Sequence, residues 1–85
     1  MELKDTVEAM CSEDYKERMA AEHAQLKIRY KKLKAFTSKI EAAEMTGQEA
    51  PVHDCPLRLL QKQLRIMGQY LHVLEVRANI EGVEL

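Results

Sequence analysis

The chain has 85 residues and a net charge of −1, and 46% of its residues are hydrophobic, with one Phe and no Trp. A chain of this length forms one small domain at most, and aliphatic content of this kind suits packing of helix on helix. The near-neutral charge argues against a duplex-DNA-binding protein. No run approaches the ~18 apolar residues that span a bilayer, and no signal-peptide hydrophobic region is present.

Residues 1–11 are expected to form a short helix, because their apolar residues recur at steps of four and three. Ser12, which two acidic residues follow, predicts a hydroxyl-capped start for the next helix, since the helix dipole favours carboxylates in a first turn. The long helix is expected over residues 13–44, which contain no Gly or Pro.

A ladder with alternating steps of four and three runs along this long helix. The ladder consists of Tyr15, Met19, Glu22, Leu26, Arg29, Leu33, Phe36, Ile40 and Ala43. A 3.5-residue repeat keeps one stripe of a helix against a partner helix. Glu22 and Arg29 are charged at positions where packing favours apolar residues, so these two are candidates for a role beyond packing.

A break follows at residues 45–55, where the heptad stops and Gly and Pro occur. We expect this stretch to be the loop between two helices. Asp54 or Cys55 is the predicted cap of the second helix, with Pro56 tolerated in its first turn. That helix is expected over residues 56–80.

The second helix carries a ladder with the same alternation. This ladder consists of Leu57, Leu60, Leu64, Met67, Leu71, Leu74 and Ala78. Gly82 is the expected stop signal of this helix. Gly68 within the helix predicts close approach of another backbone or of a ligand, because glycine costs roughly 1 kcal/mol relative to alanine there.

The two ladders predict an all-α fold, an antiparallel, coiled-coil-like two-helix hairpin with a short N-terminal helix, as one domain over residues 1–85. A two-helix hairpin has a single seam and buries too little apolar surface to be comfortably stable alone. We therefore expect several copies to associate as a homo-oligomeric helical bundle.

With the loop at the apex, the predicted register pairs Leu26 with Leu71. Glu22 then lies near Arg77 and is expected to form an ion pair that fixes the register. Arg29 lies near Tyr70 in the same alignment.

Two further features flank the seam. Tyr15 and Tyr70 are expected to pack in the core with their hydroxyls reaching solvent. Gln63, Tyr70 and Arg77 form their own seven-residue row, a candidate oligomer interface.

A basic band reads KIRYKKLK over residues 27–34. On a near-neutral protein, such a band fits a small anionic ligand better than a polyanion, and the alternative is a solvated helix face. Arg29 beside Lys32, with the ring of Tyr70 nearby, is chemistry suited to recognition of a phosphate and a base.

The usual signatures of catalysis are absent. No Gly-rich phosphate loop, nucleophile elbow or HExxH motif occurs. The run His53–Asp54–Cys55 lacks a second ligand pair at zinc spacing, so neither a metal nor another cofactor is expected, and we do not expect an enzyme. Cys11 and Cys55, in a chain without a secretory signal, are expected to be reduced thiols of a cytoplasmic protein.

The spacing of DYKERMAAEHAQLKIRYKKLKAF and LRLLQKQLRIMGQYLHVLEVRANI resembles a family of small phage-encoded helical-hairpin proteins noted in crAss-like and other tailed phages. The likeness spans roughly residues 14–80. The matching positions are Tyr15, Arg18, Glu22, Lys32, Leu33, Phe36, Leu59, Leu60, Gln63, Met67, Tyr70, Leu74 and Arg77. In size and architecture the group is similar to the anti-CBASS and anti-Thoeris sponges, phage proteins that sequester the nucleotide signals of bacterial immunity.

The resemblance implies a phage accessory protein in the infected cell that oligomerises and binds a cyclic-oligonucleotide or ADP-ribose type of signal without altering it. The candidate residues for base stacking and phosphate contact, in pockets between protomers, are Tyr15, Arg18, Arg29, Lys32, Tyr70 and Arg77. The alternative is a structural or protein-binding helical module that inhibits a host protein by direct contact.

Overall fold

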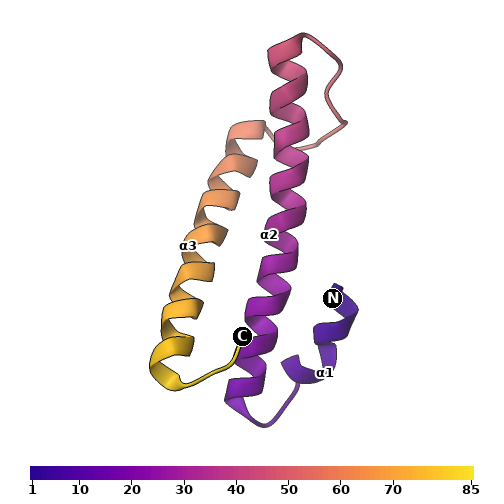
Figure 1. The fold of residues 1–85 in the computed structure, drawn as a ribbon. Coiled ribbons are helices and arrows are strands. Elements are labelled where there is room, and N and C mark those ends of the chain that lie inside the picture. The colour runs from indigo at the N-terminus through magenta and orange to yellow at the C-terminus, as the bar shows by residue number, and fades with distance from the viewer.

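The computed structural model describes residues 1–85, which form helices and no strands (Figure 1). A 3₁₀ turn, η1 (Leu3–Thr6), continues into a single α-helical turn, α1 (Val7–Met10), and two long helices follow, α2 (Tyr15–Thr46) and α3 (Leu57–Glu81). Helices α2 and α3 run antiparallel and pack against each other. The prediction of an all-helical hairpin is confirmed.

The start of α2 differs from the sequence-based expectation. Asp14 is the capping residue, and its carboxylate accepts a hydrogen bond from the backbone N–H of Lys16 at 3.0 Å. Ser12, the predicted cap, lies two residues earlier, where its hydroxyl accepts from the backbone N–H of Asp14 at 3.1 Å and donates to the Glu17 carboxylate. Serine and aspartate both cap helices well, and here the capping residue is Asp14, which lies nearer to the first turn of α2.

The other helix ends depend on glycine and proline. Gly47 and Gly82 end α2 and α3 with φ of 69° and 72°, the left-handed conformation that glycine adopts without a steric penalty. The expected stop at Gly82 is therefore confirmed. The predicted side-chain cap at Asp54 or Cys55 is wrong, because Pro56 occupies the capping position of α3 and no side chain caps it.

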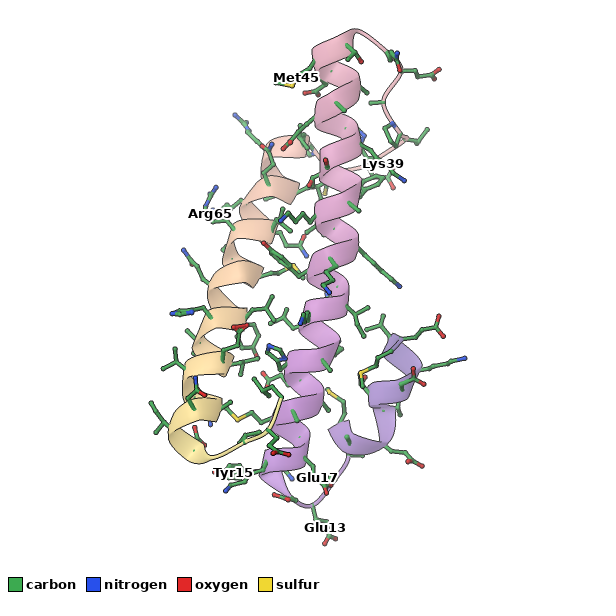
Figure 2. The ribbon with its side chains drawn as sticks, viewed as in Figure 1. Glu13, Tyr15, Glu17, Lys39, Met45 and Arg65 are labelled. Carbon is green, nitrogen blue, oxygen red and sulfur yellow. The ribbon has the colours of Figure 1, made fainter.

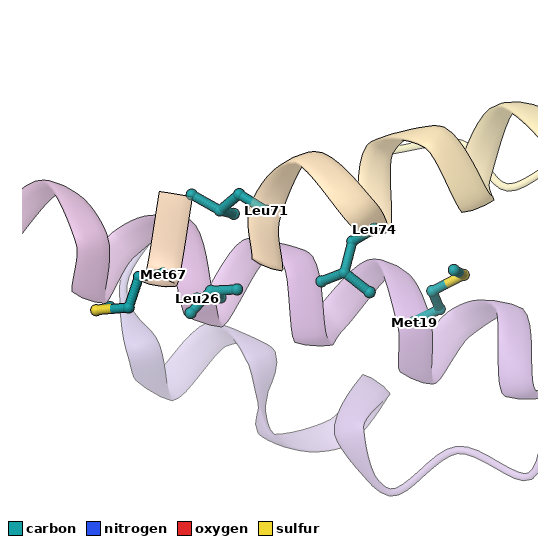
Figure 3. Close-up of a cluster of buried hydrophobic side chains, with 5 residues drawn as sticks. All are labelled: Met19, Leu26, Met67, Leu71 and Leu74. Atoms are coloured by element: carbon teal, nitrogen blue, oxygen red, sulfur yellow. The ribbon is translucent and has the colours of Figure 1, made fainter. Parts of the chain in front are cut away.

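A cluster of buried side chains fills the seam between α2 and α3 (Figure 3). The cluster consists of Met19, Leu26, Met67, Leu71 and Leu74. All five belong to the predicted ladders. Only 12 of the 85 residues are buried, so this small core carries much of the stability of the chain.

The register of the two helices follows the predicted alignment closely. The expected pairing of Leu26 with Leu71 places residue 23 opposite residue 74 and residue 30 opposite residue 67. In the structure His23 contacts Glu75 and the ring of Tyr30 lies over Gly68. The observed contacts therefore fall within one residue of the prediction.

The N-terminal segment and the loop after α2 cover α2 away from the seam. The N-terminal segment packs on α2, and both Thr6 and Ala21 are buried. The loop after α2 turns back along that helix (Figure 1), and the imidazole of His53 meets the ring of Phe36 edge-on, with centroids 6.4 Å apart. Ile40 on the same helix is fully buried. Helix α2 is thus covered on more than one side.

The close neighbour of Gly68 within the chain is the side chain of Tyr30, so the expected close approach of another backbone is wrong. We expect Gly68→Ala to raise the free energy of unfolding by up to ~1 kcal/mol, because alanine has the higher helix propensity. The added methyl group would lie 3.5 Å from Tyr30 Cε2, an ordinary van der Waals contact. Urea unfolding followed by circular dichroism measures the change.

Gly82→Ala is the matched control for this substitution. Its φ of 72° strains any residue with a Cβ, so the same exchange is expected to cost about 1 kcal/mol there. A marked loss of stability in Gly68→Ala would contradict the prediction.

Candidate functional site

The largest depression on the protein is an open groove of about 720 Å³ along α2. Glu75 of α3, Met1 and Leu85 line parts of its rim. Helix α2 supplies the remaining lining residues, which are His23, Ala24, Lys27, Ile28, Lys31 and Lys32. Three of these six are lysines of the basic band.

Helical spacing explains why lysines and aliphatic residues alternate in this groove. Residues four apart share one face of a helix, so Lys27 and Lys31 lie one above the other. Ala24 and Ile28 form a parallel aliphatic row beside them. The groove therefore offers ammonium groups, which bind phosphate, next to an apolar strip that suits a ring or a sugar edge.

The lining of the groove includes a contact between the two helices. His23 is buried, and its Nε2 lies 3.5 Å from Oε1 of Glu75. This contact ties α2 to α3 and places one carboxylate near three lysines. The groove keeps an excess of positive charge.

The sequence-predicted residues Tyr15 and Arg77 come together at the open end of the hairpin. Arg77 donates to Glu81 from Nε at 2.7 Å and from Nη2 at 3.2 Å. Glu22 lies near Arg77 as predicted, since the hydrogen bond to Glu81 and, more weakly, the charge of Glu22 raise the pKa of Arg77. The predicted ion pair itself is not formed, because Arg77 pairs with a carboxylate one turn away on its own helix.

The same carboxylate reaches Tyr15, which lies where α2 begins (Figure 2). A hydrogen bond from Arg77 lowers the pKa of Glu81, and a hydrogen bond to Glu81 raises the pKa of Tyr15. Tyr15, Arg77 and Glu81 thus form one exposed cluster.

The other predicted residues have different surroundings. Arg18 donates from Nη1 to the backbone carbonyl of Ser12 at 2.6 Å, so it helps to fix the chain entering α2. Arg29 and Tyr70 are both exposed and make no cation–π contact with each other. Lys32 is the one predicted residue that lines the groove.

The expectation that Tyr15 and Tyr70 pack in the core is also wrong. Both side chains are exposed, at 42% each. Tyr30, from the basic band, packs against the buried cluster instead. Tyr30 flanks the seam on α2, and its side chain is long enough to reach the buried cluster from the side.

Sequence reasoning did not select Lys27 and Lys31 as candidate site residues. The heptad directed attention to the seam, whereas these lysines lie on a neighbouring face of α2. The signal that finds them is the row His23, Lys27 and Lys31 at steps of four.

Three further findings concern membranes, metals and cysteines. No helix combines the length and the apolar character that a bilayer crossing requires. No three His, Cys, Asp or Glu side chains are close enough together to hold a metal ion. Cys11 and Cys55 are both free and exposed.

Comparison with known proteins gives one match. A family model described as Sequestin matches residues 13–80. That stretch includes all of α2 and α3, and with them the groove lysines. No curated protein and no solved structure matches the chain.

Proposed function

Because the chain belongs to the Sequestin family, a name that indicates a sequestering role, we propose that it binds and sequesters a small nucleotide-derived signal without altering it. The ligand is of the cyclic-oligonucleotide or ADP-ribose type. The protein acts as a phage accessory protein in the cytoplasm of the infected cell, where removal of the signal evades host defence.

The lysine groove is the observation that carries this proposal. Lys27, Lys31 and Lys32 surround a depression large enough for a nucleotide-sized ligand, and the aliphatic row gives a base or ribose an apolar surface. Hydrogen bonds between charged partners are roughly twice as strong as neutral ones, so two or three phosphate contacts favour a charged nucleotide over a neutral nucleoside.

The remaining sequence-predicted residues form a second candidate surface. Arg29 and Tyr70 are exposed, and Arg29 makes no salt bridge in a single copy, so its guanidinium and the Tyr70 ring are free for a phosphate and a base. Arg18, Tyr15 and Arg77 already have partners within the chain, and a ligand there has to share or displace them.

Thermal melting against a panel of cyclic dinucleotides, cyclic trinucleotides and ADP-ribose derivatives tests the proposal. A ligand that binds only the folded state, at a hundredfold excess over its dissociation constant, raises the free energy of unfolding by about 2.7 kcal/mol. We expect such a shift with at least one charged member of the panel and none with adenosine. Chromatography of the released ligand should recover it unchanged.

A panel that gives no shift would contradict the proposal. It would favour the second candidate function, a helical module that inhibits a host protein by direct contact. Exposed apolar side chains on α3 are the observation behind that candidate.

A further inference from the structure

The outer face of α3 carries a row of exposed aliphatic side chains at intervals of seven residues. Leu59, Ile66, Val73 and Ile80 are exposed by 52%, 52%, 53% and 78%. The seven-residue row of Gln63, Tyr70 and Arg77 lies between these aliphatic residues. Taken together, the two rows are spaced alternately by four and three residues along the helix. The complete outer row is Leu59, Gln63, Ile66, Tyr70, Val73, Arg77 and Ile80.

We propose that the outer row packs antiparallel against the outer row of a second copy of the chain. The two hairpins then associate through their α3 helices. This inference concerns assembly and does not depend on the identity of the ligand.

The repeat itself argues for a helix as the occupant. The outer row holds a 3.5-residue spacing over three heptads, from Leu59 to Ile80, which is a stretch of roughly 32 Å at 1.5 Å per residue. The inner ladder of α3 holds the same spacing against α2. A helix with two adjacent heptad rows packs on two neighbours at once, as helices of a four-helix bundle do.

The hydrogen-bond donors of Arg77, at one end of the row, select the antiparallel direction. Arg77 pairs with Glu81 of its own helix through Nε and Nη2, and a parallel pair would turn its remaining N–H groups toward Arg77 of the partner subunit, which offers no acceptor. In the antiparallel pair, Arg77 lies toward Gln63 of the partner subunit, whose amide oxygen accepts hydrogen bonds.

The aliphatic residues suit the same direction. Leu59 lies toward Ile80 of the partner subunit, and Ile66 lies toward Val73 of the partner subunit. Tyr70 falls near the twofold axis, where two rings cover the middle of the interface. In the pair the Tyr70 ring is therefore not available to a ligand, and of the second candidate surface Arg29 stays free. A self-complementary patch of this kind is what a twofold interface requires.

The lysine groove remains open in this arrangement. His23 contacts Glu75, and Tyr30 covers Gly68, on one flank of the seam. Helical spacing places Tyr70 and Arg77 on the opposite flank of α3, about half a turn from Gly68 and Glu75. A pair of hairpins therefore presents two grooves to solvent and brings Arg29, which lies on the same flank as Tyr70, beside the interface.

The decisive experiment measures mass and binding separately. Size-exclusion chromatography with light scattering at micromolar concentration is expected to give twice the chain mass of 9.8 kDa. The double variant Ile66→Glu/Val73→Glu should run as a monomer, because it places four carboxylates in the interface. The control Val52→Glu changes a loop residue that is 94% exposed, and it should stay dimeric.

A monomeric wild type would overturn the inference, and so would a double variant that remains dimeric with unchanged helicity. Nucleotide-induced melting shifts are read on the same samples. Because the groove lies on the other flank, the monomeric variant should retain the wild-type shift, so failure of the interface and failure of the ligand proposal give different results.

Spin labels test the direction of the helices. Arg58→Cys is placed in a Cys11→Ser/Cys55→Ser background, which is permissive because both native cysteines are exposed. In the antiparallel pair the two labels lie at opposite ends, roughly 30–40 Å apart along the axis. A distance under about 20 Å would show parallel helices and overturn the proposed arrangement.

Discussion

Truncating Leu74 to alanine is expected to lower the free energy of unfolding by about 3 kcal/mol, within the range of 2–5 kcal/mol typical of buried leucines. Leu74 is only 1% exposed, and it extends from α3 into the buried cluster (Figure 3). Domains of this size are stable by roughly 4–13 kcal/mol in total. The loss is therefore a large part of the stability of a single hairpin, and the melting temperature should fall by about 12–24 °C.

Met45→Ala is the matched control for Leu74→Ala. Both substitutions shorten a long apolar side chain on a helix to a methyl group. Met45, however, is 88% exposed near the end of α2, so we expect its free energy of unfolding to change by less than about 0.5 kcal/mol. Urea unfolding and thermal melting, both followed by circular dichroism, measure the two variants. Equal losses would show that the seam does not carry the stability.

The hairpin was predictable because a seam depends on a repeating pattern. Met19, Leu26 and Leu74 follow one rule over many residues, so a single exception does not change the outcome. The same rule aligned the helices to within one residue, since displacing one helix by a few residues would bring apolar side chains out of the seam.

Local choices were less predictable, because several side chains compete for one position. Serine and aspartate are both good capping residues, and Ser12 and Asp14 are only two positions apart. The sequence does not determine which of them caps α2. Arg77 could have reached Glu22 across the seam, but Glu81 lies one turn away on the same helix, where less side-chain entropy is lost on pairing.

The groove could not be read from the ladders for a different reason. Its shape depends on where Met1 and Leu85 lie against α2, and neither position follows from a heptad. The chemistry of the groove was nevertheless visible as the basic band. What the sequence left open was whether the band faces only solvent, and the structure shows that three of its lysines line a depression.

The outer row on α3 was only partly visible in the sequence. The row of Gln63, Tyr70 and Arg77 was recognised as a possible interface, but the aliphatic residues between them were not. Exposure is the property that separates this row from the inner ladder, because both have the same spacing. Lysines on one flank and an apolar row on the other give the hairpin two separate surfaces.

Reversing the charge of the groove should have the largest effect on binding. In Lys27→Glu/Lys31→Glu, two ammonium groups that attract phosphate become carboxylates that repel it. We expect the affinity for the panel member that shifts wild-type melting to fall at least a hundredfold, which corresponds to about 2.7 kcal/mol. Isothermal titration calorimetry measures the dissociation constant.

The fold of this variant should be unaffected. Both lysines are exposed, and the substitution keeps a like-charged pair four residues apart, so helicity and melting temperature without ligand should match wild type. Lys39→Glu/Lys62→Glu makes the same change in net charge at exposed lysines outside the groove and should bind within about threefold of wild type, because exposed distant charges are screened by salt. Equal weakening in both variants would mean that net charge alone attracts the ligand. Full binding by Lys27→Glu/Lys31→Glu, with binding lost in Arg29→Ala, would place the ligand on the opposite flank of the hairpin.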